Sequence, residues 1–167
     1  MAPASHTVDA STGVVHPKRR ALLIGAVGGV LMHSSAGLAT PPPAIQVWKE
    51  ANCGCCNDWV ALLKKAGFTV QVFDQGNTKD RARLGMPQQY GSCYTGLVQG
   101  YVVEGHVPVS DIQRLLKQKP EALGLAVPGM PVGSPGMDGG DYGNRRDPYK
   151  VLLIQKDGVA QVFNTYS

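Results

Sequence analysis

The sequence predicts an α/β domain in the order strand, helix, strand, helix, strand, strand, helix. Three observations lead to this prediction. Two short apolar stretches that resemble strands flank a stretch with helical periodicity near residue 60, a hairpin signal follows near residue 99, and helical spacing returns after that hairpin. An apolar fraction of 43% in 167 residues is enough to build the core of one such domain.

The first half of the pattern is a strand–helix–strand unit. Residues 44–49 predict a short strand with apolar side chains on its buried face. Residues 57–66 predict a helix, because their apolar side chains recur on one face and Gly67 follows as a helix stop. Residues 68–73 alternate between apolar and polar side chains, which predicts the second strand.

The second half adds a short linking helix, a hairpin and a final helix. Residues 78–84 predict a short polar helix. Residues 92–98 and 101–104 predict two strands joined by a Gln-Gly turn, and residues 108–117 predict an amphipathic helix. The complete order is that of the thioredoxin fold.

A segment of different composition separates this unit from the end of the chain. Residues 120–148 are rich in glycine and proline and contain two Pro-Gly-Met runs, which end at Met130 and Met137. A disordered linker is one interpretation, but the segment lies inside the domain, where long loops are often functional. Residues 149–155 and 159–166, split by an Asp-Gly pair, predict a second hairpin. The predicted fold is therefore thioredoxin-like, with an added Gly/Pro/Met loop and a C-terminal β-hairpin.

Residues 1–39 are predicted to be an export signal peptide of the twin-arginine type, which would place the protein in the periplasm. A Lys-Arg-Arg run precedes a moderately apolar stretch, and Gly-Leu-Ala then offers small residues to a signal peptidase. The apolar stretch is shorter than the ~20 residues of a membrane-spanning helix, so we expect cleavage and no stable membrane insertion afterwards. Residues 40–167 then form one predicted domain, whose 13 basic and 11 acidic residues give a formal charge of +2. This balance gives no support for a nucleic-acid partner.

The four cysteines of the chain carry its main chemical signal. Cys53, Cys55 and Cys56 form a Cys-Gly-Cys-Cys run directly after the first predicted strand, and Cys93 begins the third. Cys53 and Cys56 have the spacing of a redox dithiol at a helix N-terminus, where thiolates are stabilised. Cys55 adds a thiol that a simple dithiol does not need. In the predicted topology Cys93 lies opposite this helix end, so the sequence predicts a four-thiol pocket.

Three further residues are candidate metal ligands. His106 is the only histidine in residues 40–167, and it follows the same hairpin that begins with Cys93. Met130 and Met137 offer thioethers, although methionine is by default a core residue, as a lone histidine is by default a surface one. Four thiolates suit zinc, Cu(I) or an iron–sulfur cluster. Thiolates beside methionine and histidine in an exported protein favour copper, because these ligands are soft.

Several runs of the chain match a known family, and they include Val47-Trp48-Lys49, Cys53-Gly54-Cys55-Cys56, Ser92-Cys93, Glu104-Gly105-His106-Val107-Pro108 and Gly124-Leu125-Ala126-Val127-Pro128-Gly129-Met130-Pro131. On these runs the chain resembles the CopG family of copper-resistance proteins over roughly residues 44–155. The resemblance implies a thioredoxin-like fold, a periplasmic location, a copper site built from the cysteines, and a role in copper tolerance with interconversion of Cu(I) and Cu(II). One departure is Tyr94, which stands where the family usually has histidine and would place more weight on His106.

The sequence leaves three functions open. The first is a periplasmic copper-binding protein with a multinuclear Cu(I)–thiolate cluster, whose partners are copper ions, other periplasmic copper-resistance proteins or an electron donor or acceptor. It could also be an oxidoreductase acting on copper. The second is a thiol–disulfide oxidoreductase that uses Cys53 and Cys56. The third is an exported binding module held by two disulfides.

Overall fold

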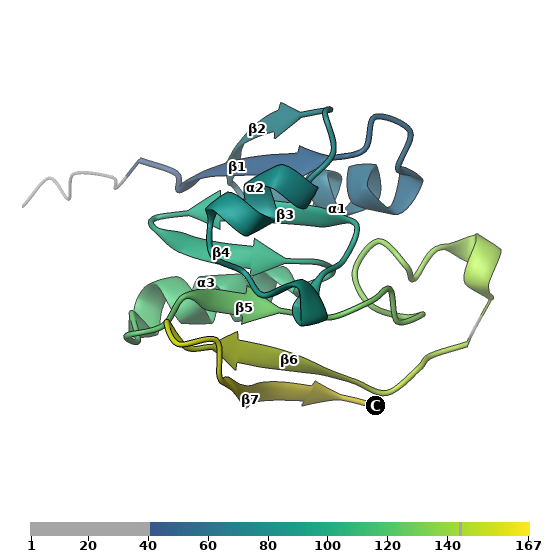
Figure 1. Ribbon diagram of the computed structural model, residues 1–167. Helices are drawn as coiled ribbons and strands as arrows, with labels where there is room; N and C mark the ends of the chain where they lie inside the picture. The colour runs from purple at the N-terminus through teal and green to yellow at the C-terminus, as the bar shows by residue number, and fades with distance from the viewer. Residues whose placement is uncertain (1–40, 144) are drawn as a thin grey trace, which may run out of the picture. The chain divides into compact units, whose positions relative to one another are not determined.

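A computed structural model describes residues 41–143 and 145–167, in which seven strands form one mixed sheet accompanied by three α-helices (Figure 1). The predicted signal peptide, residues 1–39, lies outside the described residues. The strands are β1 Ala44–Lys49, β2 Thr69–Phe73, β3 Tyr94–Val98, β4 Tyr101–Glu104, β5 Gly124–Ala126, β6 Tyr149–Ile154 and β7 Ala160–Tyr166. The helices are α1 Gly54–Lys65, α2 Thr78–Arg83 and α3 Val109–Gln118, with short 3₁₀ turns η1 Gln88–Tyr90 and η2 Gly140–Tyr142.

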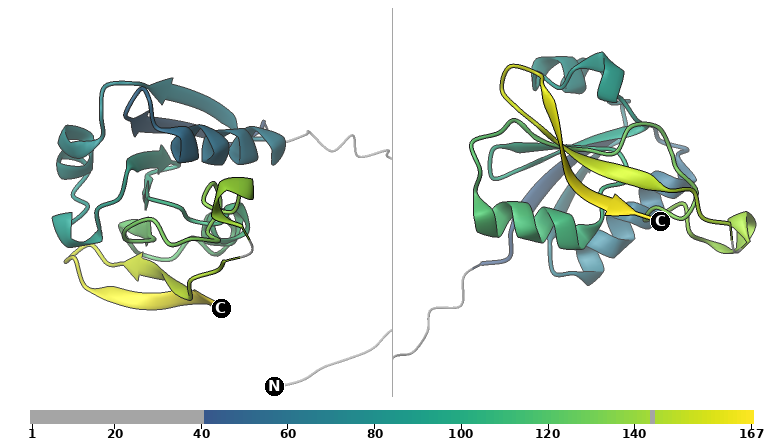
Figure 2. Two further views of the ribbon diagram at one scale, coloured as in Figure 1. Left: turned by 90° about the vertical axis from the view of Figure 1, so that its right-hand side faces the viewer. Right: turned by 90° about the horizontal axis from the view of Figure 1, so that it is seen from below.

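The first seven major elements confirm the predicted order. The sheet runs β2-β1-β3-β4-β5-β6-β7, in which β1 pairs parallel with β2 and antiparallel with β3. Helices α1 and α3 cover one face and α2 lies on the other (Figure 2). No helix among residues 41–143 and 145–167 is long and apolar enough to cross a membrane.

Successive strand residues point to opposite sides of the sheet. Buried side chains form a cluster on each side. Val103 and Leu125 belong to the larger core, which includes Trp59 of α1. Their neighbours Val102 and Ala126 belong to a smaller cluster on the other face. The larger core packs α1, at whose start three of the cysteines lie, against the strands that Cys93 precedes and His106 follows.

The 120–148 segment departs from the prediction, because it is not all loop. It contains β5, which pairs parallel with β4 and antiparallel with β6. At Gly124 a Cβ atom would overlap the backbone of Val102, so glycine permits this close pairing. The predicted C-terminal hairpin is confirmed as β6 and β7, and β5 joins it to the rest of the sheet.

Candidate metal centre

Three of the four cysteines lie at the start of α1, and we call them the helical half of the site. Cys53 is the N-cap in an extended conformation, and its N–H donates to Glu50 O at 3.2 Å. Cys55 and Cys56 follow in the first turn, so the helix begins at Gly54, three residues before the predicted start. The unpaired N–H groups of a helix start favour negative charge on these sulfurs. Cys53 and Cys56 form a disulfide, while Cys55 is a free thiol.

The pairing of β1 with β3 brings the fourth cysteine to the same place. Lys49, the last residue of β1, pairs with Tyr94, the first residue of β3. Cys93 therefore stands directly opposite the turn that leaves β1 for the cysteine run. The Cys55 Sγ atom lies 3.6 Å from Cys53 Sγ and 3.9 Å from Cys93 Sγ. All four sulfur atoms lie within 4.8 Å of one another, which confirms that the cysteines gather in one cluster.

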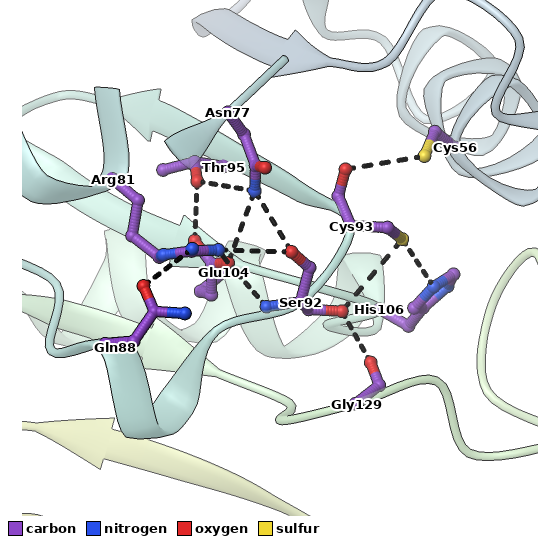
Figure 3. A network of polar contacts seen from close by, with 10 residues as sticks. All are labelled: Cys56, Asn77, Arg81, Gln88, Ser92, Cys93, Thr95, Glu104, His106 and Gly129. Carbon is purple, nitrogen blue, oxygen red and sulfur yellow. Dashed lines mark hydrogen bonds and ion pairs between the residues drawn. The ribbon is translucent and has the colours of Figure 1, made fainter. Parts of the chain in front are cut away.

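His106 completes what we call the strand half of the site, together with Cys93. Its Nε2 atom lies 3.3 Å from Cys93 Sγ (Figure 3). Its Nδ1 atom lies 2.8 Å from Pro135 O. A carbonyl oxygen can only accept, so Nδ1 carries the proton and the Nε2 lone pair faces the sulfur. A bond of this kind fixes the ring of a metal-binding histidine. His106 is fully buried rather than at the surface.

Burial controls the protonation of the strand half. It raises the pKa of the Cys93 thiol to about 12, and the neighbouring Cys55 adds to this effect. It also lowers the pKa of His106, against the opposing effect of the Pro135 hydrogen bond. Cys93 is thus a neutral thiol near pH 7, and a bound metal ion would displace its proton.

The Gly/Pro/Met loop reaches the site through its backbone. Gly129 O accepts a hydrogen bond from Ser92 Oγ, next to Cys93. Gly136 packs so closely on the first turn of α1 that a Cβ atom there would lie 2.5 Å from Cys55 O. The methionines that follow these glycines differ, because Met130 is 53% exposed whereas Met137 is buried. The role of either thioether as a ligand stays a prediction.

Comparison with known proteins agrees with this geometry. Residues 90–137 match the family model described as protein of unknown function, DUF411. Two solved structures titled copper resistance protein CopG, form 1 and form 2, are each 45% identical to the chain with a TM-score of 0.69. The matches cover 75% of this chain and 98% and 99% of those chains. The chain belongs to the CopG family. None of the curated proteins matches it.

The donor set of this CopG homologue is able to bind metal. Four sulfur atoms converge from two elements, and one imidazole nitrogen faces them. Sulfur donors select Cu(I), zinc or iron–sulfur clusters over hard cations. A metal that uses all four sulfurs requires the Cys53–Cys56 disulfide to be reduced first, because thiolates are the ligands.

Two features beside the site were not predicted from the sequence: the hydrogen-bond network of Glu104, and the burial of Tyr94 next to His106. Glu104 is fully buried, and its carboxylate accepts hydrogen bonds from Ser92, Thr95 and Arg81. Burial raises its pKa, and these hydrogen bonds oppose the shift. The available signal was a charged residue at the end of an apolar strand. Such a residue is rarely fully buried without a partner, so its position indicates a buried polar contact.

The second feature is the aromatic side chain of Tyr94. Its ring packs against those of Trp59 and His106, with centroids 4.4 Å and 5.1 Å away. It is fully buried, and its hydroxyl has no hydrogen-bond partner among the described residues. Burial raises the pKa of Tyr94 well above its usual value, and the cysteines Cys93 and Cys55 add to the shift.

Proposed function

We propose that this protein binds copper in the periplasm as part of copper resistance, and that its four cysteines hold a multinuclear Cu(I)–thiolate cluster. The observation that carries the proposal is the gathering of four sulfur atoms within 4.8 Å in a CopG homologue. A sulfur that bridges two metal ions gives a use to Cys55, the thiol between the Cys-x-x-C pair. We also propose that the first four strands with α1, α2 and α3 form a thioredoxin-like unit that carries this site.

In the proposed site His106 supplies a nitrogen ligand or near-ligand beside Cys93. Its fixed tautomer leaves Nε2 available, and its buried position keeps solvent away. Cu(I) prefers soft sulfur ligands whereas Cu(II) favours nitrogen and oxygen, so a mixed set shifts the potential between the two states. Interconversion of Cu(I) and Cu(II) by this site, with an exported electron donor or acceptor, is part of the proposal.

The Cys53–Cys56 disulfide favours a second candidate function, thiol–disulfide exchange. In that reaction Cys53 would attack a substrate disulfide and Cys56 would resolve the mixed intermediate. Cys55 and Cys93 would then have no chemical role. The two functions therefore make opposite predictions for Cys55.

We expect the fully reduced protein to bind more than one Cu(I) ion per chain with protection of all four thiols. Cys55→Ser should lower the copper stoichiometry by at least one ion and leave the fold intact, because serine is nearly isosteric but a poor ligand for Cu(I). The measurement is an anaerobic Cu(I) titration with a free-thiol count and metal analysis for copper and zinc.

Cys53→Ser is the matched variant for the alternative. For a dithiol enzyme Cys53→Ser abolishes insulin reduction while Cys55→Ser leaves it unchanged, and neither protein need hold copper. Unchanged copper content in Cys55→Ser would contradict the cluster. An absence of copper uptake, with rapid insulin reduction, would move the protein to the exchange class.

A further inference from the structure

We propose that Glu104 is the positioning residue of the strand half: its buried carboxylate fixes Ser92, and through Ser92 it holds the Cys93 sulfur opposite the α1 cysteines. This positioning role rests on the proposed copper function, in which Cys93 is a copper ligand. The residues involved come from β3, β4, α2 and the turns between them (Figure 3).

The carboxylate collects donors from three segments. Oε1 accepts the Ser92 N–H at 2.7 Å, Arg81 Nη1 at 3.2 Å and Asn77 Nδ2 at 3.5 Å. Oε2 accepts the Thr95 hydroxyl at 2.6 Å. The Glu104 side chain has no exposed area, so its carboxylate oxygens are hydrogen-bonded by protein donors alone. Such a satisfied network is rigid, because moving one member leaves the others without partners.

Ser92 is held at each of its polar atoms by this network and the loop beside it. Its N–H donates to Glu104, and its carbonyl accepts Asn77 Nδ2 at 3.1 Å and Arg81 Nη1 at 3.2 Å. Its hydroxyl donates to Gly129 O. Because Cys93 is the next residue, the position of its backbone follows from that of Ser92.

The other neighbour of Cys93 is fixed by the strand that carries Glu104. Tyr94 O accepts the N–H of Gly105 at 3.1 Å. Gly105 has a φ of +70° and turns the chain so that His106 returns to Cys93. The end of β4 therefore contributes to both members of the strand half: the Glu104 side chain holds Ser92 beside Cys93, and the Gly105 turn places His106.

A purely structural role is the alternative, and the chain offers a matched control for it. Asp111 is a second buried carboxylate, and it accepts Tyr166 Oη at 2.8 Å, Asn164 Nδ2 at 3.0 Å and Arg114 Nη2 at 3.2 Å. The bonds from Tyr166 and Asn164 join α3 to β7, whereas the Arg114 pair lies within α3. Loss of Asp111 or Asn164 should therefore weaken the fold without loosening Cys93.

The test compares Glu104→Gln with Asp111→Asn, and Asn77→Ala with Asn164→Ala, in the full chain. The first readout needs no copper: the alkylation rate of Cys93 by iodoacetamide in the reduced protein, with Cys55 of the same chain as internal reference. The second is the Cu(I) affinity in competition with a chromophoric chelator. Unfolding by urea is measured for each variant, so that rates and affinities are compared between proteins that are folded.

We expect Glu104→Gln and Asn77→Ala to raise the Cys93 to Cys55 alkylation ratio at least fivefold and to weaken Cu(I) binding at least tenfold. Asp111→Asn and Asn164→Ala should leave both values within twofold of the parent. Site variants that match their controls in both readouts would overturn the proposal. If Glu104→Gln does not fold, Asn77→Ala against Asn164→Ala decides. If the parent takes up no copper, the proposed function fails, and the alkylation ratio still decides whether Glu104 positions Cys93.

Discussion

The two halves of the four-sulfur site are held in different ways. In the helical half, Cys53, Cys55 and Cys56 follow one another along the first turn of α1, so local chain geometry sets their spacing. The turn before them is supported by Lys49, whose Nζ donates to Glu50 O and Ala51 O and pairs with Asp74. In the strand half, Ser92 beside Cys93 is held by Glu104, and His106 is held by Pro135, both through hydrogen bonds to residues outside the local turn.

The two halves therefore differ in how far their sulfur atoms can move. The strand half has little freedom, because Ser92, Glu104 and Pro135 fix its members from several sides. In the helical half Cys53 and Cys56 form a disulfide, and its reduction to two thiols would move their sulfur atoms apart. A fixed partner and an adjustable one suit a site that takes up metal after reduction of the disulfide.

The largest effect should come from Gly105→Ala in the strand half. Gly105 has a φ of +70°, and a Cβ atom would overlap Val127 O and the Ser92 side chain. Ser92 cannot move aside without breaking its bonds to the Glu104 network. We expect the free energy of unfolding to fall by about 4 kcal/mol, from left-handed strain and overpacking together. Urea unfolding measures it.

Gly100→Ala is the control for backbone strain alone. Gly100 has a φ of +86°, but a Cβ atom there would meet nothing within 4 Å. Its cost should be about 1 kcal/mol. Equal losses in the two variants would show that Ser92 and Val127 move aside for the added Cβ atom, which would contradict a rigid strand half.

A smaller loss should follow Gly136→Ala in the loop that packs on the helical half. Its φ is +83°, and the added Cβ atom would lie 2.5 Å from Cys55 O and 3.2 Å from Trp59 N. Gly136 lies in a loop rather than at the end of a paired strand, so its backbone can shift more easily and we expect a loss of about 2 kcal/mol in unfolding free energy. The matched control is Gly129→Ala, in the other Pro-Gly-Met turn, where a Cβ atom meets nothing within 4 Å. A loss in Gly136→Ala larger than that in Gly105→Ala would reverse the comparison of the halves.

The sequence predicted the helical half more fully than the strand half. Cysteine spacing alone placed Cys53, Cys55 and Cys56 together, because neighbours in a turn stay close in space. Including Cys93 required the predicted strand order, which the pairing of Lys49 with Tyr94 confirms. The start of α1 was predicted three residues late, since Gly-Cys-Cys has little helix propensity and no side chain caps the helix.

The missed elements have no local pattern. β5 is three residues long, too short to show alternation, and it is defined by its partners β4 and β6. The Glu104 network joins residues 27 positions apart, from Asn77 to Glu104, and polar side chains at such distances have no periodicity to detect. Burial of Glu104 therefore became visible only with the fold.

The smallest effect should come from Tyr94→Phe, at the boundary of the two halves. The Tyr94 hydroxyl is buried and has no hydrogen-bond partner among the described residues, so its removal should stabilise the protein by up to about 1 kcal/mol. Tyr101→Phe is the matched control, because Tyr101 Oη donates to Pro120 O at 2.9 Å and its loss should cost about 1 kcal/mol. Urea unfolding of both reduced proteins without copper gives the sign. A loss of stability in Tyr94→Phe would show that the hydroxyl does have a hydrogen-bond partner. The two halves would then be joined by a polar contact at Tyr94.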